Sequence, residues 1–317
     1  MKPPYKITSE IVKLVAEISE RLGQINAIHL YKPPPELRKK NRIKTIQSTL
    51  ELEGNTLTEE QVFGLLENKR VIGPPKDILE VQNAIELYNQ IHLFNPNSLK
   101  DFKKAHAILM KGLIEQAGKF RTKNVGIMKG ASLKHLGPNG RILNGLMKDL
   151  FSYLKSAKEI SLIKSCVFHY ELEFIHPFLD GNGRMGRFWQ TVILIQEFPV
   201  FEYLPIESLI KENQEDYYKV LEQSDKLGES TPFIEWMLTI LLESLNRLLE
   251  SQNRSLTVED RIALFKEKFQ KREFSRKDYL LNFKEISIAT ASRDLRWAVN
   301  QNILIKKGDK RITKYEF

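Results

Sequence analysis

The chain has 317 residues, 42% of them hydrophobic, and 49 lysines and arginines against 40 aspartates and glutamates give it a formal net charge of +9. This length suits two domains or one domain with an appendage, and the composition is that of a globular protein with ample core. One cysteine excludes an internal disulfide, and because the sequence has neither a membrane-spanning apolar run nor an apolar signal core, we expect a cytoplasmic protein without membrane contact.

The N-terminal part of the chain (1–97) is predicted to form a helical region. Thr8 and Ser9 can cap a first helix whose apolar residues recur at helical spacing. A run of three prolines interrupts the pattern. A second helix then begins near Leu37 and is expected to end at Gly54 in a glycine C-cap.

A second region (98–250) shows further amphipathic helices around one irregular stretch. Between Lys123 and Arg141 the helical period is lost, and several glycines interrupt the chain. This pattern predicts a short β-hairpin, although an irregular loop would show the same composition.

The stretch from His176 to Arg187 reads H-P-F-L-D-G-N-G-R-M-G-R and precedes an apolar-rich run with helical character. Gly181 and Gly183 lack a Cβ atom, so this loop can turn tightly and present backbone N–H groups at the N-terminus of the helix. Such N-termini attract anions. Arg184 and Arg187 lie on one face of the first turn, and two cations there indicate a polyphosphate ligand.

Two other side chains of this stretch suit phosphate chemistry. Asp180 would repel a phosphate unless a divalent cation lay between them, and Mg²⁺ is often bound by one or two carboxylates plus phosphate oxygens. His176 can accept a proton near neutral pH, as a base that activates a hydroxyl must.

Simpler interpretations of the stretch fit less well. G-N-G-R-M-G matches the dinucleotide-binding fingerprint, but that motif follows a strand and here a helix-like segment comes first. A calcium loop would need glycine at Met185 and glutamate at Thr191. A plain Asn-Gly turn explains neither His176 nor the arginine pair.

With every fixed position filled, the stretch resembles the signature of the Fic family, H-P-F-x-D/E-G-N-G-R-x-x-R. The resemblance implies a mostly α-helical fold with a Fic catalytic core (98–250) and transfer of AMP from ATP to a protein hydroxyl. It also implies that His176 is the base, that Asp180 binds Mg²⁺ and that Phe178 anchors the loop in the core. The hairpin would be a flap that pairs with an extended segment of the target protein. The implied phosphate ligands are Gly181, Asn182, Gly183, Arg184 and Arg187.

The end of the second helix carries a second resemblance to this family. The sequence T-L-E-L-E-G-N, from Thr49 to Asn55, resembles the inhibitory motif S/T-x-x-x-E-G/N of some Fic proteins. By this resemblance an inhibitory helix (about 37–54) supplies Thr49 and Glu53, and Glu53 would pair with Arg187 and occupy the γ-phosphate region. The resting protein would then be autoinhibited. An ordinary solvated glutamate at a helix end is the alternative.

The basic charge is concentrated in the C-terminal segment (251–317). It holds 16 basic and 9 acidic residues, whereas the first 250 residues hold 33 and 31. Its predicted helices, the last from Ser287 to Asn300, and two β-rich pieces around Gly308 and Asp309 resemble a winged helix-turn-helix domain. Such domains bind DNA or serve as protein-contact modules, so both partners remain open. The candidate DNA contacts are Thr290, Ser292, Arg293 and Arg296 on the helix, with Lys306, Lys307, Lys310 and Arg311 for the backbone.

Two hypotheses follow. The first is a protein adenylyltransferase, inhibited by Glu53, that modifies a Tyr, Thr or Ser hydroxyl of a target protein and of itself. Some relatives with such a glutamate also remove AMP. The second is a DNA-binding regulator that senses nucleotide without turnover, although a sensor would need neither base nor metal ligand. Transfer of a phosphoryl group is a lesser variant of the first. We also expect a homo-oligomer, in the form of a dimer.

Overall fold

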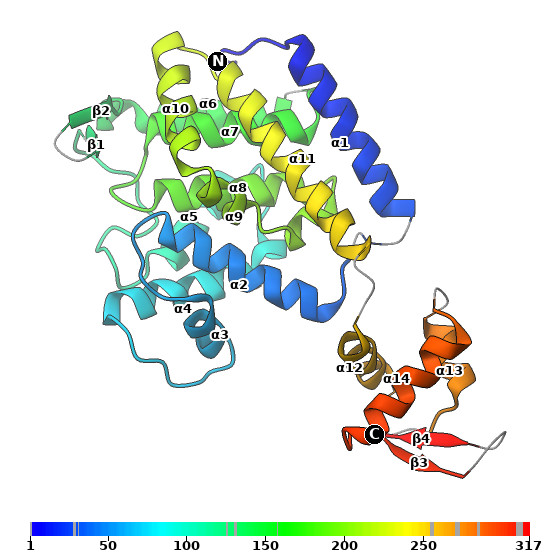
Figure 1. Cartoon of the computed structure of the whole chain (residues 1–317). Coiled ribbons are helices and arrows are strands. Elements are labelled where there is room, and N and C mark those ends of the chain that lie inside the picture. The colour runs from blue at the N-terminus through cyan, green and yellow to red at the C-terminus, as the bar shows by residue number, and fades with distance from the viewer. Residues whose placement is uncertain are drawn as a thin grey trace. The chain divides into compact units, whose positions relative to one another are not determined.

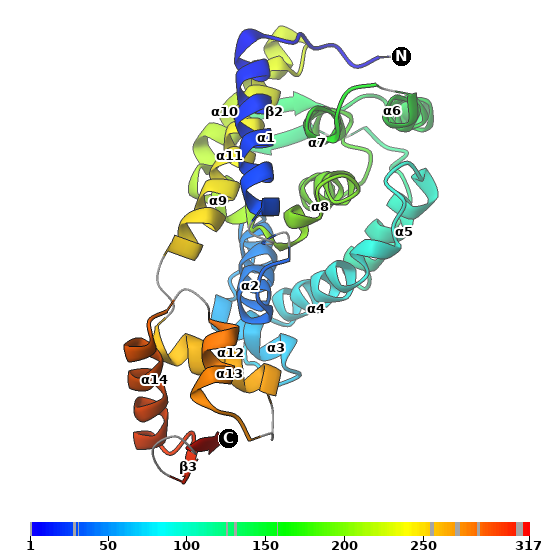
Figure 2. The same cartoon turned by 90° about the vertical axis from the view of Figure 1, so that its right-hand side faces the viewer.

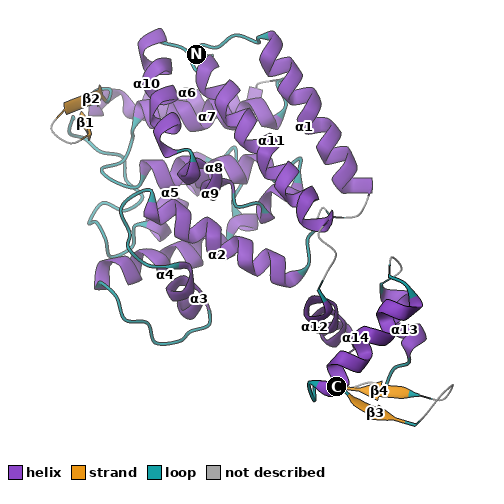
Figure 3. Ribbon diagram, viewed as in Figure 1, coloured by secondary structure: helices purple, strands orange, loops and turns teal. Residues whose placement is uncertain are grey.

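The computed structural model of the chain describes residues 2–27, 30, 32–124, 126–129, 132–156, 158–253, 257–269, 273–283, 286–308 and 313–317. Most described elements are α-helices (Figure 3), so the expectation of a mostly helical fold is confirmed. The chain divides into two compact units, Met1–Leu248 and Leu249–Phe317. None of the helices in the described ranges has the length and apolar character that crossing a bilayer requires.

The first unit contains both the N-terminal region and the region assigned to the core (Figure 1). Its early elements are α1 (Ser9–Ala27), α2 (Pro35–Glu51), α3 (Glu59–Leu66), α4 (Pro75–Asn89) and the 3-10 helix η1 (Ile91–Leu93). Its later elements are α5 (Leu99–Leu109), β1 (Gly126–Lys129), β2 (Ser132–Leu136), η2 (Gly140–Ile142), α6 (Leu143–Ser156), α7 (Ser161–Ile175), α8 (Asn182–Leu194), η3 (Pro199–Tyr203), α9 (Ile206–Glu212), α10 (Gln214–Leu227) and α11 (Thr231–Asn253).

Helix α1 lies along α11 in both views (Figures 1 and 2). Its apolar stripe is buried, as the helical spacing predicts. Thr8 joins the two helices, because its hydroxyl accepts a hydrogen bond from the Ile11 N–H at 3.2 Å and donates one to Glu235 at 2.6 Å. The N-terminal helix is therefore part of the same core as the rest of the unit.

Helices α7 and α8 form the centre of the first unit. Every residue of α8 except Gly183 is buried. Phe168 of α7 and Trp189 of α8 pack with Phe102 and Phe151, with ring centroids 5.1 to 6.2 Å apart in edge-on or tilted pairs. The short loop between the two helices is therefore attached at both ends to rigid core elements.

The last regular residue of α2 is Glu51. The glycine C-cap expected at Gly54 follows it, because the Asn55 N–H donates to the Leu50 carbonyl at 3.1 Å. Tight turns follow α2, in which the Glu53 N–H donates to the Leu50 carbonyl and the Gly54 N–H to the Glu51 carbonyl, each at 2.9 Å. Gly54 has a φ of +90°, which reverses the chain at a conformation that glycine adopts without strain. Glu53 consequently lies in a turn beyond the helix.

The hairpin expected between Lys123 and Arg141 is present in the described residues. Strands β1 and β2 are antiparallel, with Gly126 opposite Leu136 and an irregularity after Ile127. The pair projects from one edge of the helical body (Figure 1). Residue 125 and the connection at 130–131 lie outside the described residues.

The second unit comprises α12 (Val258–Phe269), α13 (Arg276–Asn282), α14 (Ile288–Asn300) and the antiparallel strands β3 (Ile305–Lys307) and β4 (Lys314–Glu316). Phe265, Tyr279 and Leu295 are fully buried in its core. The Ser287 hydroxyl caps α14 by accepting the Thr290 N–H at 3.1 Å. Gly308 is described, whereas Asp309 and the proposed basic contacts Lys310 and Arg311 lie outside the described residues.

Candidate phosphate-transfer site

His176 is the C-cap of α7, and its backbone is left-handed, with φ of +49° and ψ of +60°. This conformation costs a non-glycine residue about 1 kcal/mol or more, so the surrounding contacts must impose it. The imidazole is 21% exposed, and its Nδ1 lies 3.4 Å from the Glu173 carbonyl oxygen and 3.9 Å from Glu173 Oε2. Two acceptors on that side place the proton on Nδ1 and leave Nε2 as the basic nitrogen.

A buried arginine holds this backbone in place. Arg121 is 1% exposed, and its guanidinium donates to the carbonyls of His176 at 2.7 Å, Ile175 at 3.2 Å, Lys123 at 2.8 Å and Pro138 at 2.8 Å. Since Lys123 and Pro138 flank the hairpin, one side chain joins both ends of the hairpin segment to the candidate base. From the sequence alone, Arg121 was assigned no role.

The loop after His176 is anchored by a stacked pair of rings. Phe178 is fully buried, and the His106 ring stacks on it with centroids 3.5 Å apart and planes 6° apart. Nδ1 of His106 accepts the Gly118 N–H at 2.8 Å, so Nε2 carries the proton and donates to the Asp180 carbonyl at 2.9 Å. Burial lowers the pKa of His106 to about 4, so the ring is neutral near pH 7. His106 is thus a structural support of the loop.

Asn182 closes the loop on itself. Its side-chain oxygen accepts the Phe178 N–H at 2.9 Å, and its side-chain nitrogen donates to the Phe178 carbonyl at 3.0 Å. The buried amide is therefore committed to the loop, and of the phosphate contacts expected for Asn182 only the backbone N–H is placed for one. Gly181, the N-cap of α8, has a φ of +84°, and a Cβ there would lie 2.8 Å from Met110 Sδ.

Gly183 is the point where charged groups converge. A Cβ on Gly183 would lie 2.7 Å from Glu53 Oε1, 3.1 Å from Arg187 Nη1 and 3.3 Å from Glu173 Oε1. Only glycine leaves this space beside the first turn of α8, where an anion is favoured by the helix N-terminus. The space that we expect a phosphate to use is therefore bordered by one guanidinium and two carboxylates.

Asp180 has the exposure and charge of a ligand for Mg²⁺. Its side chain is 48% exposed, and Oδ1 accepts the Gly181 N–H at 2.6 Å and Arg184 Nη2 at 2.9 Å. These bonds engage Oδ1 and leave the exposed Oδ2 available to a cation. No group of three metal-ligating side chains occurs within the described ranges, so a metal here would depend on Asp180 and on phosphate oxygens, which suits Mg²⁺.

Arg184 is 3% exposed and lies between two carboxylates. Beside its bond to Asp180, it donates from Nη1 to Glu80 Oε1 of α4 at 3.3 Å. The other oxygen of Glu80 accepts from the Asn55 side chain at 2.8 Å. Because Asn55 is two residues after Glu53, Glu80 connects Arg184 to the turn that bears Glu53. Sequence reasoning missed Glu80, which in the sequence is one glutamate on an amphipathic helix.

Arg187 is bound by the end of α2. Nε donates to the Thr49 hydroxyl at 2.9 Å, and Nη2 donates to the Thr49 carbonyl at 3.1 Å and to Glu53 Oε1 at 2.7 Å. The Arg187 side chain is 2% exposed and that of Glu53 30%. Burial alone would lower the pKa of Arg187, but the adjacent Glu53 carboxylate raises it above its ordinary value. The contact expected between Glu53 and Arg187 is present as a charged, partly buried bond.

Glu173 is a third carboxylate at this position that sequence reasoning did not select. Its Oε1 is buried and has no hydrogen-bond partner among the described residues. Burial raises the pKa of Glu173 to about 7; attraction by Arg187 opposes this rise, and repulsion by Glu53 adds to it. The only sequence signal was its place three residues before His176, one helical turn away.

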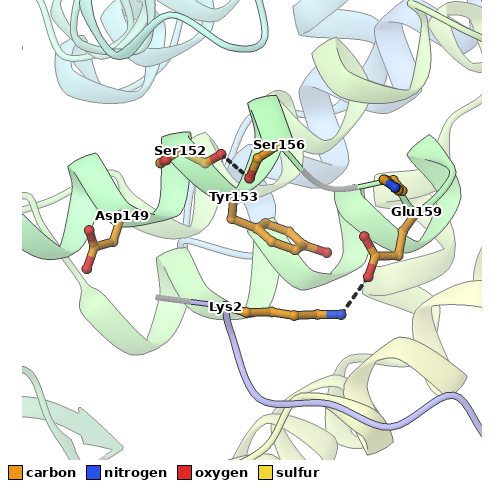
Figure 4. Close-up of a pocket in the computed structure, with 7 residues that line it drawn as sticks. Lys2, Asp149, Ser152, Tyr153, Ser156 and Glu159 are labelled. Atoms are coloured by element: carbon orange, nitrogen blue, oxygen red, sulfur yellow. Dashed lines mark hydrogen bonds and ion pairs between the residues drawn. The ribbon is translucent and has the colours of Figure 1, made fainter.

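A separate pocket of about 470 Å³ lies where the N-terminal segment crosses α6 (Figure 4). Lys2 and Glu159 pair across it at 2.7 Å, and the Tyr5 hydroxyl donates to Glu159 at 2.6 Å. The carboxylate is thus already engaged, and Lys2 first, then Tyr5, lower the pKa of Glu159 to about 2. These bonds tie the N-terminal segment to the core, and we do not place the reaction there.

In the second unit, the candidate DNA contacts lie on the outer side of α14. Arg293 and Arg296 are exposed, whereas Thr290 and Ser292 are partly buried. On β3, Lys307 is paired with Glu273 at 2.9 Å and with Glu316 at 2.6 Å, so it is engaged within the unit.

Comparisons with known sequences and structures identify relatives of this chain. A sequence profile of the Fic/DOC family matches residues 96–194, which include the whole loop and α8. A crystal structure of a Fic family protein from Desulfovibrio desulfuricans is 38% identical and superposes with a TM-score of 0.78, covering 100% of this chain and 98% of that chain.

Curated relatives are more distant. Protein adenylyltransferase Fic from Nematostella vectensis is 27% identical over 250 residues, covering 73% of this chain and 54% of that protein. Protein adenylyltransferase fic-1 from Caenorhabditis briggsae is 28% identical over 208 residues, covering 61% of this chain and 38% of that protein. The chain thus spans about half or less of the length of these relatives.

Proposed function

The chain is a member of the Fic/DOC family, and on that premise we propose that it is a protein adenylyltransferase that transfers AMP from ATP to a Tyr, Thr or Ser hydroxyl of a protein. The observation that carries the proposal is the convergence of three groups on one anchored loop. These groups are a histidine with a basic Nε2, a half-exposed carboxylate at Asp180, and a helix N-terminus with two arginines.

In the proposed reaction, Nε2 of His176 accepts the proton of the target hydroxyl as its oxygen attacks the α-phosphorus and pyrophosphate leaves. The N–H groups of α8 with Arg184 and Arg187 hold the phosphates and stabilise the charge that develops on them. Asp180 would hold a Mg²⁺ ion, which would neutralise further charge on the phosphates. The remaining task of the protein is to position hydroxyl and phosphorus in line, which the anchored backbone at His176 supports.

We further propose that Glu53 inhibits the enzyme. In the described conformation Nε and Nη2 of Arg187 are bound to Thr49 and Glu53, and the Glu53 carboxylate borders the space that a γ-phosphate would use. Productive binding of ATP then requires the turn at Glu53 to move. After that movement the same carboxylate could orient a water molecule for removal of AMP, the reverse activity considered from the sequence.

The test uses the Glu53→Gly variant with Mg²⁺ and ATP labelled at either the α- or the γ-phosphate, with and without cell lysate. We expect label from the α-phosphate on protein bands, on the enzyme itself among them, at least tenfold above wild type. His176→Ala in the Glu53→Gly background is the matched control and should lose the label while still binding ATP.

Each other outcome selects a different function. Label from the γ-phosphate would indicate phosphorylation and a reversed nucleotide. Equal label in wild type and Glu53→Gly would contradict autoinhibition. Absence of label despite ATP binding would favour the nucleotide-sensing regulator.

For the second unit we propose DNA binding through a winged helix-turn-helix, which the exposed Arg293 and Arg296 on the outer side of α14 favour. The double variant Arg293→Ala/Arg296→Ala should weaken binding to duplex DNA roughly tenfold or more and reduce the salt dependence of the affinity. Arg247→Ala, an exposed arginine of α11, is the control. A wild-type chain that binds no DNA in low salt would identify the unit as a protein-contact module.

A further inference from the structure

One stretch of the first unit has an unusual charge. From Gln116 to Lys148 the sequence contains seven lysines and arginines and no aspartate or glutamate. The first 250 residues hold 33 basic and 31 acidic side chains; without this stretch the counts are 26 and 31, a balance of −5. The positive charge of the first 250 residues is therefore concentrated in the stretch that contains the hairpin.

The structure places this stretch beside the candidate base. Arg121 donates to the carbonyls of Lys123, Pro138 and His176, all within 2.8 Å. The two ends of the hairpin segment are also in close contact, because a Cβ on Gly140 would lie 2.2 Å from the Thr122 carbonyl oxygen. The hairpin therefore begins and ends next to His176 and projects from the helices there (Figure 1).

Three cations of this stretch flank the ends of the hairpin, and we call them the basic rim: Lys119, Lys123 and Arg141. All three side chains are exposed, and none forms an ion pair with a carboxylate within the described residues. Elsewhere in the first unit some exposed lysines have such partners, as Lys2 has in Glu159 and Lys6 in Glu229. Each strand of the hairpin contributes one more lysine in sequence, Lys129 and Lys134.

We propose that the basic rim selects an acidic polypeptide segment, so that the enzyme prefers hydroxyls flanked by aspartate and glutamate. This inference rests on the proposed function and names the substrate class of that site. The nucleotide phosphates have their own ligands at the N-terminus of α8, on the loop after His176, so the rim is not needed for ATP. An exposed strand edge pairs with an extended peptide, and opposite charges raise the rate of encounter and fix the register.

The experiment measures AMP transfer by the full-length Glu53→Gly enzyme to three unstructured peptides. Each peptide has one central tyrosine, with acidic, uncharged or basic flanks. We expect kcat/KM for the acidic peptide to exceed that for the uncharged one about tenfold at 50 mM salt, and the ratio to fall toward one as salt is raised.

Charge reversal tests the rim itself. Lys123→Glu/Arg141→Glu should reverse the order of the peptides and leave the KM for ATP unchanged. Lys155→Glu, an exposed lysine at the far end of α6, is the matched control and should retain the acidic preference. Thermal unfolding of each variant shows whether a loss of rate reflects a loss of fold.

The possible results distinguish a failure of the acidic preference from a failure of the proposed function. Transfer to all three peptides with equal kcat/KM would overturn the acidic preference alone. Absence of transfer to every peptide and to the enzyme itself would overturn the proposed function as well. Equal inhibition by a tyrosine-free acidic peptide and by a single-stranded oligonucleotide of the same charge would make the rim a nucleic-acid surface instead.

Discussion

Nε of Arg121 donates to the carbonyl oxygen of His176 at 2.7 Å, 55 residues apart in the sequence. The acceptor belongs to the residue whose left-handed backbone directs the candidate base into the site. With its three further carbonyl acceptors, the guanidinium holds α7, the motif loop and the hairpin in one arrangement. Arg121 is therefore a positioning residue that acts on the reaction through His176.

The first prediction concerns Arg121→Lys. A lysine keeps the charge but cannot donate in a fork to four carbonyls, so buried acceptors lose their partners at a cost of about 2–4 kcal/mol in unfolding free energy. A small displacement of the base should lower kcat about 100-fold with the KM for ATP nearly unchanged. Urea unfolding and initial rates measure both, with Arg247→Lys on the surface as control. A kcat equal to that of the parent enzyme would show that Arg121 has no part in positioning.

The second prediction concerns the stability of the Glu53→Gly variant. Without Glu53, the 2% exposed Arg187 keeps Thr49 but has no carboxylate in hydrogen-bond contact. We expect a loss of about 1–3 kcal/mol in unfolding free energy. Mg²⁺ and ATP should restore more stability to the variant than to wild type, because a ligand stabilises the state that it binds. Thermal shifts with and without nucleotide measure this, and equal shifts in both proteins would contradict competition between Glu53 and ATP.

The sequence was sufficient to predict the features that depend on residues close together in the chain. The loop from His176 to Arg187 is contiguous, so its glycines, carboxylate and arginines could be proposed together as one site from the sequence alone. The same holds for the amphipathic helices and for α14 with its Ser287 cap, since each depends on spacing within about 15 residues.

The sequence was insufficient to predict the role of a residue that depends on a partner far away in the chain. Arg121 acts on His176, and Glu80 acts on Arg184 across 104 residues, and no periodicity encodes either contact. Asn182 was expected to contact phosphate through the motif, yet its amide bonds to Phe178 four residues away.

The third prediction follows from the bond between Asn55 and Glu80. This 2.8 Å bond fixes the turn that bears Glu53 to α4, and α4 to Arg184. Asn55→Ala should loosen the turn and raise transfer of the α-phosphate label several-fold, though less than Glu53→Gly, because the inhibitory carboxylate is retained. Asn300→Ala on the exposed end of α14 serves as control. A variant with wild-type activity would show that the turn is held without Glu80.

The fourth prediction concerns the pH dependence of stability. The pKa of Glu173 is about 7 in the folded protein, above the ordinary value of 4.5, with Arg187, Glu53, Tyr217, Asp225 and His176 as its charged or titratable neighbours. The folded state therefore binds the proton more tightly, and this contribution is complete below pH 4.5 and is lost as pH rises through 7. A pKa difference of this size corresponds to about 3 kcal/mol as an upper bound.

Glu173→Gln removes that titration. Its unfolding free energy should vary less between pH 5 and pH 8 than that of wild type. Glu243→Gln, at a residue of α11 whose side chain is 46% exposed, should follow wild type. Urea unfolding at four pH values in this range measures the difference. Parallel curves for wild type and Glu173→Gln would show that the carboxyl does not change its protonation on folding.

The last prediction concerns the second unit, where a buried ion pair joins α12 to α14. Nε of Arg261 donates to Asp294 Oδ2 at 2.6 Å and Nη2 to Oδ1 at 2.8 Å, and the Tyr279 hydroxyl donates to Oδ2 at 3.2 Å. Asp294 is 1% exposed. Removal of one partner leaves the other charge buried, so Asp294→Ala should cost this unit about 3–5 kcal/mol.

That loss can be observed apart from the first unit. Because residues 249–317 form a compact unit of their own, Asp294→Ala should become sensitive to protease within this segment while ATP binding persists. The double variant Arg261→Met/Asp294→Leu removes both charges and should recover much of the stability, since an apolar pair of similar volume needs no solvation. Failure of the double variant to recover protease resistance would show that the pair, and not only its charge balance, is required to join α12 to α14.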